Sequence, residues 1–378
     1  MNILIAPDSF KGSLSAEAVG KAAAVGVKKV MDSAEVVIVP MADGGEGSID
    51  ALRPFLQKEV AVGVEGPSGS PVETSYGVIE FEGRYTALVE CARSTGLTLV
   101  DDEERHPYQL TSYGLGEQIK DAVERGYRDI IVSLGGSATT DGGTGMLRAL
   151  GYTFIDFDGK PIRQGENPLG NIRSIDDSGR LSDLDDCRIT IASDVTNPFF
   201  GIDGAAHVYG PQKGATPEHV MELDEGLKDL AAIVEAKYGV DLQEIPGAGA
   251  AGGLGGALAG VLGAQMKPGF DIIAELTGLE GKIKDADVVL TGEGSLDAQS
   301  AHGKVPVSVG VMAKRFDKPV IAMAGKVDPT DFRPAIDAVY SIQRCPVSLE
   351  EAVDGEAAST NITFTVENIM RTIILSPL

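Results

Sequence analysis

The chain has 378 residues, a formal net charge of −24 at pH 7, and ordinary shares of hydrophobic (43%) and charged (23%) residues. This length suffices for two domains, each with its own core. The acidic excess argues against a protein that binds nucleic acid or anionic membranes, since both depend on basic patches. It does not exclude an anionic substrate, because a few lysines and a metal ion can reverse the charge inside a pocket.

The cysteines and the hydropathy pattern exclude further classes of protein. Cys91, Cys187 and Cys345 are widely separated and odd in number, so neither a disulfide framework nor a structural zinc site is predicted. No apolar run reaches the ~18 residues of a membrane span, and the N-terminus reads as a buried strand rather than a signal peptide. We therefore expect a cytoplasmic monomer or homodimer.

The first sixty residues have the pattern of an α/β domain. Residues 2–6 form an apolar run typical of a buried parallel strand. An alanine-rich helix follows, with Ser15 as its N-cap and an end near Val30. Residues 35–40 predict a second strand. This alternation of strand and helix indicates a parallel sheet.

From about residue 60 the pattern changes. Residues 59–65, 72–81 and 85–90 read as strands separated by turns, which predicts an antiparallel meander. The elements expected after it are a helix over 109–126, strands over 129–134 and 188–193, and an amphipathic helix over 217–238.

Near residue 285 the first pattern returns, with further strands and a C-terminal helix. These elements are expected over 287–290, 318–323, 338–341 and 359–373. The parallel-sheet domain would then comprise residues 1–63 and 285–378, and residues 64–284 would form an inserted second α/β domain.

Two polar loops follow the first two predicted strands. Asp8, Ser9 and Lys11 precede a helix start, where free N–H groups favour an anion. Asp43 and Glu46 stand among glycines that let bare backbone approach a ligand. The structural alternative for the first loop is local capping by Asp8. The alternative for the second is a tight turn in which Glu46 lies in the first turn of a helix and interacts favourably with the helix dipole.

The loop over residues 291–304 carries both acids and a base. Glu293 and Asp297 could hold a metal or take a hydroxyl proton, and Lys304 could neutralise a phosphate. Residues 292–297 also repeat the pattern of residues 45–50. Either this is coincidence between two tight turns, or both loops lie at the carboxyl ends of parallel strands, where such sheets bind ligands.

The predicted insert carries further polar loops. Ser137 and Thr139 lie between double glycines in a segment that resembles an anion nest, although a plain flexible loop is the alternative. Asp194 and Asn197 directly follow a predicted strand. Their oxygens suit magnesium or substrate hydroxyls, and the alternative is an Asx turn before proline.

One motif is misleading. Residues 247–252 fit G-x-G-x-x-G, but a poor strand precedes them and no strand ending in an acid follows about 20 residues later, so we reject a dinucleotide site. A helix start at Gly252 that holds an anion stays open. Neither a Walker loop nor G-x-S-x-G occurs.

Taken in order, these loops resemble the glycerate kinase type-1 family. The segments that carry the resemblance are residues 6–12, 42–47, 135–139, 197–198, 211–215 and 291–294. The resemblance implies ATP-dependent, Mg²⁺-dependent phosphorylation of D-glycerate to 2-phosphoglycerate in the catabolism of glycerate and related organic acids. It also implies a flavodoxin-like domain interrupted by a restriction-enzyme-like α/β insert with a mixed sheet. Thr140 and Ser193 depart from the family pattern, whereas the acids and lysines of the motifs agree with it.

The residue types and the resemblance together give a hypothesis for each role. The expected catalytic residues are Lys11, Asp194, Glu293 and Asp297. The expected metal ligands are Asp43, Glu293 and Asp297. The expected substrate or nucleotide contacts are Asp8, Ser9, Asp43, Glu46, Ser137, Thr139, Asn197, Lys213, Gly249, Gly252 and Lys304.

We expect the site in a cleft between the domains. The alternatives are a kinase of another small hydroxy acid and a non-catalytic relative that binds carboxylates. A coupled ADP assay distinguishes these.

Overall fold

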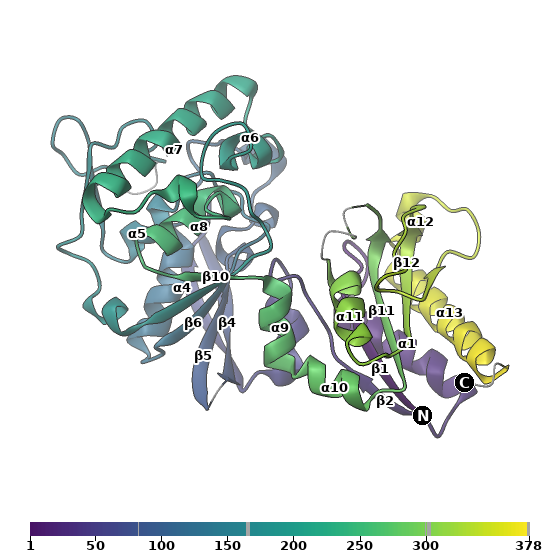
Figure 1. Cartoon of the computed structure of the whole chain (residues 1–378). Coiled ribbons are helices and arrows are strands. Elements are labelled where there is room, and N and C mark those ends of the chain that lie inside the picture. The colour runs from purple at the N-terminus through teal and green to yellow at the C-terminus, as the bar shows by residue number, and fades with distance from the viewer. Residues whose placement is uncertain (82, 164–166, 299, 301–303, 376–378) are drawn as a thin grey trace. The chain divides into compact units, whose positions relative to one another are not determined.

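The computed structural model describes residues 1–81, 83–163, 167–298, 300 and 304–375 (Figure 1). Two compact units emerge, which we call the parallel-sheet unit (Met1–Asp43, Asp50–Phe55 and Phe270–Leu378) and the mixed-sheet unit (Gly44–Ile49 and Leu56–Gly269). The predicted limits lay at residues 63 and 285. Within the described residues, no helix is both long and apolar enough to cross a membrane.

The parallel-sheet unit is built on strands from both ends of the chain. They are β1 (Asn2–Pro7), β2 (Glu35–Ile38), β11 (Val288–Leu296), β12 (Val320–Val327) and β13 (Ala338–Ser341). Their order is β2-β1-β11-β12-β13 and neighbouring strands run parallel. This is the flavodoxin-like order, so the predicted fold class is confirmed. The apolar runs that predicted the strands reflect burial on both faces of the sheet.

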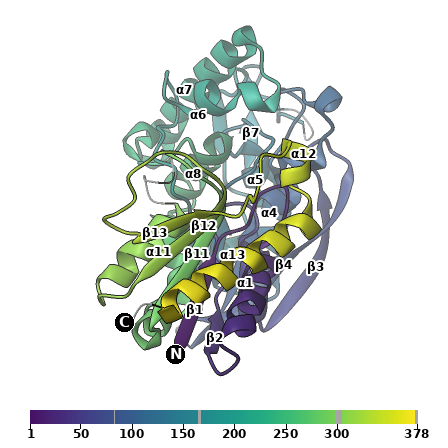
Figure 2. The same ribbon diagram turned by 90° about the vertical axis from the view of Figure 1, so that its right-hand side faces the viewer.

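Helices cover both faces of this sheet. On one face α1 (Ala16–Val30) and α13 (Gly355–Leu375) lie side by side, as Figure 2 shows, and α11 (Val305–Lys314) covers the other. The Ser15 side chain caps α1 by accepting from Ala18 N at 3.3 Å, as predicted. The unit also contains α9 (Gly269–Thr277), α10 (Leu279–Asp285) and α12 (Leu349–Ala352).

The mixed-sheet unit has a second sheet, of order β10-β9-β6-β5-β4-β3. Its strands are β3 (Lys58–Glu65), β4 (Pro71–Phe81), β5 (Arg84–Glu90), β6 (Asp129–Ser133), β9 (Arg188–Ala192) and β10 (Gln265–Lys267). Strands β3, β4 and β5 pair antiparallel, which confirms the predicted meander, and the pairs from β5 to β10 are parallel. A separate hairpin joins β7 (Thr153–Ile155) to β8 (Ser174–Asp176).

The helices of this unit bury a large apolar core against the sheet. The longest, α7, covers the predicted range because Thr216 caps its start, Pro217 opens it and Gly239 ends it in a left-handed conformation. The α-helices are α3 (Ala92–Thr95), α4 (Tyr113–Glu124), α5 (Thr144–Ala149), α6 (Ala205–Tyr209), α7 (Pro217–Tyr238) and α8 (Ala250–Gly260). Helix α2 (Ser48–Leu52) begins in this unit and ends in the parallel-sheet unit.

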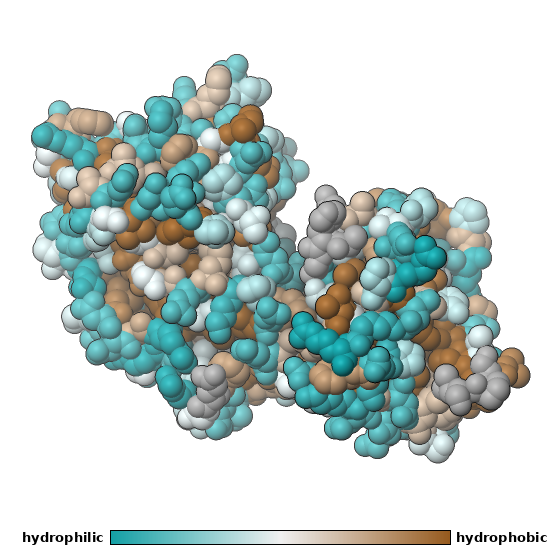
Figure 3. Space-filling view, viewed as in Figure 1, coloured by the Kyte–Doolittle hydropathy of each residue, from teal (hydrophilic) through white to brown (hydrophobic). Residues whose placement is uncertain are grey.

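Short 3₁₀ helices connect several elements. They are Arg53–Phe55, Leu97–Leu99, Asp102–Glu104, Ser182–Asp186, Pro211–Lys213 and Leu242–Glu244. Hydrophilic residues cover much of each unit's surface in the face shown in Figure 3.

One expectation about local structure is wrong. Residues 291–296 were expected as a loop, but β11 continues through them to Leu296. The extension pairs with β12, where Glu293 lies opposite Ala324 and Ser295 opposite Lys326. By contrast, the similar segment at residues 45–50 forms a turn that leads into α2. The two copies therefore have different backbone structures, and reading both as strand-to-helix loops was mistaken.

The contact between α1 and α13 depends on a glycine. A Cβ atom at Gly26 would lie 2.6 Å from Thr363 O and 2.8 Å from Val366 Cβ. We expect Gly26→Ala to lower the free energy of unfolding by about 1–2 kcal/mol, since overpacking outweighs the gain in helix propensity. Urea unfolding measures this change.

The matched control for this prediction is Gly281→Ala in α10, where a Cβ atom meets nothing within 4 Å. This control should be neutral or stabilising by about 0.5–1 kcal/mol. Equal effects of the two substitutions would contradict the packing argument.

Candidate active site

The candidate active site lies within the parallel-sheet unit, at the carboxyl ends of β1 and β11. The strand order reverses between these two strands, and open α/β sheets bind ligands at such a switch point. Asp8 N donates to Gly292 O at 2.8 Å, which fixes the loop after β1 against β11.

A cavity of about 350 Å³ opens at this switch point. Both polar or charged and apolar side chains line it. Its lining residues are Asp8, Ser9, Phe10, Lys11, Ser13, Asp43, Glu293, Gly294, Ser295, Lys304, Gly325, Lys326, Ile342, Gln343, Leu349, Ala352 and Val353.

Two buried carboxylates in this cavity have raised pKa values. Burial, and then the negative charges of Asp43 and Glu293, raise the pKa of Asp8 to about 7, although Ser9 N donates to its Oδ1 at 2.6 Å and Lys11 also acts to lower it. Burial likewise raises the pKa of Glu293, against the opposing effects of a hydrogen bond with Ser300 and of the Lys304 charge. The cavity therefore concentrates negative charge that a bound cation would relieve.

Lys304 is the N-cap residue of α11, and its ammonium faces these acids. Its Nζ lies 3.4 Å from Glu293 Oε2 and 4.0 Å from Asp297 Oδ1. The other oxygen of Glu293, Oε1, is buried without a hydrogen-bond partner among the described residues. Such a group carries an uncompensated desolvation cost, so this atom is available to a ligand.

The predicted metal ligands do not form a ready-made metal site. In the described ranges, no group of three or more acidic, histidine or cysteine side chains converges closely enough to hold a metal ion. Asp43 and Glu293 both line the cavity, whereas Asp297 lies outside its lining and interacts with Lys304. Mg²⁺ usually takes one or two protein carboxylates and completes its shell with water and substrate phosphates. Glu293 Oε1, without a hydrogen-bond partner in the described part of the chain, fits a site of that kind.

Lys213, in the mixed-sheet unit, is bound to its own chain. It is only 3% exposed, and its Nζ donates to Ser137 Oγ at 2.9 Å and to Thr139 O at 2.6 Å. Burial lowers the pKa of Lys213 to about 8. The lysine therefore fixes the loop that carries both predicted binding residues. Thr139 Oγ1 is buried without a partner in the described part of the chain.

The segment after β9 is also held by local contacts. Asp194 is exposed, and its Oδ1 accepts from Gly269 N at 2.9 Å. Asn197 Nδ2 donates to Asp203 O at 2.8 Å, and Tyr209 Oη donates to Asn197 Oδ1 at 2.7 Å. Both ends of the Asn197 amide are thus engaged within the unit, whereas the Asp194 side chain is at the surface.

The predicted glycines at the start of α8 approach the protein's own backbone. Gly249 N donates to Asn197 O at 3.0 Å, so this N–H is engaged within the unit. Gly252 has a φ of +74°, and a Cβ atom there would lie 2.0 Å from Thr139 O. These glycines let the loops at Thr139 and Asn197 pack against the helix.

Glu90 was missed by the sequence analysis, although it stabilises the turn that carries Glu46. The Glu90 side chain is 2% exposed and accepts from Gly47 N at 2.7 Å and from Ile49 N at 3.1 Å. Ser133 Oγ donates to Gly44 O at 2.7 Å on the same turn. An acid at the end of an apolar strand was the available signal. Glu46 itself is exposed.

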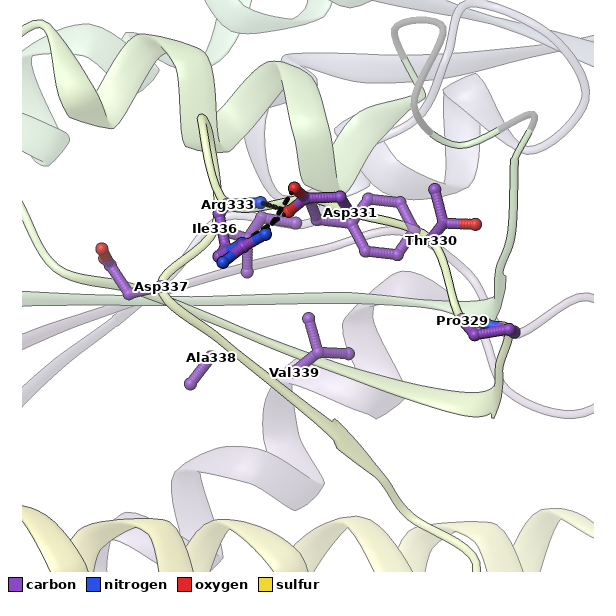
Figure 4. A pocket seen from close by; sticks show the side chains of 9 residues that line it. Pro329, Thr330, Asp331, Arg333, Ile336, Asp337, Ala338 and Val339 are labelled. Atoms are coloured by element: carbon purple, nitrogen blue, oxygen red, sulfur yellow. Dashed lines mark hydrogen bonds and ion pairs between the residues drawn. The ribbon is translucent and has the colours of Figure 1, made fainter.

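A second cavity in the parallel-sheet unit, of about 390 Å³, is shown in Figure 4. Its acid Asp331 turns toward Arg333, and two of the hydrogen bonds between them measure 2.9 and 2.8 Å. These bonds lower the pKa of Asp331 to about 2. Because its charges are already paired, this cavity is a weaker candidate than the one at the switch point.

Comparison with known proteins gives matches over the full chain. Residues 3–374 match the model of the glycerate kinase family. The chain is 44% identical to a glycerate 2-kinase of Escherichia coli K12, covering 99% of this chain and 98% of that protein. It is 42% identical to a glycerate kinase of Halalkalibacterium halodurans over 95% of this chain and 97% of that protein. A crystal structure from Salmonella typhimurium LT2, provisionally designated glycerate kinase 2, has a TM-score of 0.87 at 42% identity, covering 99% and 98% of the two chains.

The raised pKa of Asp8 predicts a pH-dependent effect of Asp8→Asn. Between about pH 4 and pH 7 the folded protein keeps a proton that the unfolded chain releases, so stability falls as the pH rises through this range. Asparagine cannot ionise. The free energy of unfolding of the variant, measured relative to that of wild type, should therefore be about 2 kcal/mol larger at pH 8 than at pH 5.

Urea unfolding at both pH values, in chelator and without nucleotide, measures this gain. The control is Asp158→Asn, at a carboxylate that is 78% exposed, which should show no such difference. A gain of Asp8→Asn that is equal at pH 5 and pH 8 would contradict the raised pKa.

Proposed function

We propose, because this chain belongs to the glycerate kinase family, that it transfers the γ-phosphoryl group of ATP to D-glycerate and forms 2-phosphoglycerate. The reaction would serve the catabolism of glycerate and related organic acids. The observation that carries the proposal is that Asp8, Asp43 and Glu293 line the cavity at the switch point together with Lys11 and Lys304.

This set of side chains matches the needs of phosphoryl transfer. The reaction needs positioned reactants and positive charge on the transferred group, and little covalent chemistry from the protein. Lys11 and Lys304 line the cavity and supply positive charge there. In our proposal they neutralise phosphate oxygens or the glycerate carboxylate.

Asp43 and Glu293 are the residues we assign to hold Mg²⁺. Glu293 Oε1, which has no hydrogen-bond partner among the described residues, is the atom best suited to this role. When bound, Mg²⁺ neutralises phosphate charge. Asp297 interacts with Lys304 and orients it, so its contribution would be indirect.

Because Asp43 and Glu293 are assigned to Mg²⁺, Asp8 is the carboxylate of the cavity that we assign to the glycerate hydroxyl. It lines the cavity next to Ser9 and is held in place by the Ser9 N–H. In our proposal Asp8 accepts the proton of the glycerate hydroxyl as that oxygen bonds to the γ-phosphorus and the bond to ADP breaks. The product is the phosphate ester.

The mixed-sheet unit supplies the remaining proposed contacts. Asp194 is exposed after β9 and can accept hydrogen bonds from substrate hydroxyls. Ser137 and Thr139 belong to the loop that Lys213 fixes, and we propose that this loop contacts phosphate or carboxylate oxygens. Asn197 would act by positioning, since its amide is bonded to Asp203 and Tyr209.

Substitutions test these roles by steady-state kinetics. Lys11→Ala, Asp194→Asn and Asp297→Asn should each lower kcat/KM by about 10²-fold or more if the residue stabilises the transition state. The control is Lys21→Ala, at a lysine that is 67% exposed and paired with Glu17 on α1. It should leave turnover unchanged, and wild-type turnover in any test variant removes that residue from the site.

Phosphorus NMR of the product tests the reaction itself. With ATP, Mg²⁺ and D-glycerate, we expect a single ester resonance whose coupling shows phosphate on the secondary hydroxyl. A product phosphorylated on the primary hydroxyl would overturn the assigned position. Absence of any ester, with turnover on another hydroxy acid in a coupled ADP assay, would overturn the substrate.

A further inference from the structure

Two chemically different sets of side chains line the cavity at the switch point. One set is the acids and lysines described above. The other is Phe10, Ile342, Leu349, Ala352 and Val353, which we call the apolar wall. Gln343 and Lys326 line the same cavity.

The apolar wall includes both buried residues and one residue that is largely exposed to solvent. Phe10 is 3% exposed and Ile342 1% exposed, so both belong to the core. Leu349, by contrast, is 79% exposed at the start of α12. A capping box fixes this short helix, because Ser348 N donates to Glu351 Oε2 at 3.0 Å and Glu351 N donates to Ser348 Oγ at 3.2 Å. A large apolar side chain is thus held beside the cavity while solvent still reaches it.

The chemistry of the two substrates decides which of them this wall suits. Glycerate carries a carboxylate and two hydroxyls on a short carbon chain, so it offers almost no apolar surface. ATP carries its charge at one end and a flat, largely apolar base at the other. A cavity lined by both charged groups and large apolar side chains offers contacts to both ends of the nucleotide.

We infer that the parallel-sheet unit binds the nucleotide, with the base against the apolar wall at Leu349 and Val353 and the phosphates toward Lys11 and Lys304. This rests on the proposed function in taking ATP as the phosphoryl donor. Gln343 strengthens the assignment to adenine, because a carboxamide offers one donor and one acceptor in the pattern that an adenine edge presents.

The test measures binding of a fluorescent N-methylanthraniloyl ADP to the full chain without glycerate. Leu349→Ser should raise its Kd about tenfold by removing apolar contact with the base. Leu349→Met, which keeps a large apolar side chain, should bind as wild type does. The control is Leu375→Ser, at a leucine that is 85% exposed on α13 and outside the cavity lining. It should leave the Kd unchanged.

Inorganic tripolyphosphate separates base binding from phosphate binding. In competition experiments with a fluorescent nucleotide, its own Kd should be the same for wild type and Leu349→Ser, because it has no base. A Kd for ADP that does not change in Leu349→Ser would overturn the inference. An equal loss of ADP and tripolyphosphate affinity would also overturn it, since it would show that the substitution disturbs the phosphate contacts.

The outcome for glycerate distinguishes this inference from the proposed function. If Leu349→Ser raises the KM for D-glycerate but leaves ADP binding unchanged, the wall faces the acid and the nucleotide assignment fails while the kinase reaction stands. If wild type binds ADP in the predicted way but phosphorylates no glycerate, the nucleotide site stands and the proposed substrate fails.

Discussion

The candidate site depends on the pairing of β1 with β11. These strands come from opposite ends of the sequence, and their register runs from Ile3 opposite Val288 to Pro7 opposite Gly292. Thr291 Oγ1 donates to Ala6 O at 2.7 Å and Asp8 N to Gly292 O at 2.8 Å, which fixes this register at the end of β1. A slip of one residue would turn each side chain of a strand to the opposite face. The proximity of the Asp8 and Glu293 charges is therefore a consequence of sheet register.

This proximity has an energetic cost that the rest of the unit must offset. Asp8 is buried close enough to Asp43 and Glu293 for their charges to raise its pKa. Asp331 shows the opposite situation, because Arg333 binds it and lowers its pKa. Buried like charges do not stabilise a fold, whereas the apolar strands and the helices packed on them do. Arrangements that oppose stability in this way are typical of functional sites.

Much of the fold could be predicted from local sequence patterns. The buried strands follow from apolar runs, and the limits of α7 follow from Thr216 and Gly239. The extension of β11 could not be predicted in this way. The residues around Glu293 include glycines that are typical of a turn, but hydrogen bonding to the long neighbouring strand β12 holds them extended. Partners distant in sequence overrode the local preference.

The candidate site was predictable to a different extent in its two parts. The acids and lysines of the cavity could be predicted because charged residues just after buried strands have few structural uses. Leu349 and Ile342 gave no such signal, since isolated apolar residues are common and only the fold places them beside Asp8. Sequence alone also cannot show whether a buried polar group already has a partner. Lys213 and Glu293 were both predicted to bind ligands, yet Lys213 is bonded to Ser137 and Thr139.

This difference in partners is the physical reason to place the reactive phosphates beside Glu293 rather than beside Lys213. The burial of Lys213 is compensated by two hydrogen bonds inside its own unit, so an added anion would have to share a cation that is already engaged. Glu293 Oε1 is buried with no hydrogen-bond partner among the described residues, although Ser300 and Lys304 interact with the same carboxyl group. A ligand that brings a cation lowers the free energy of that group directly, and a magnesium nucleotide brings one to the same cavity that has an apolar surface for its base.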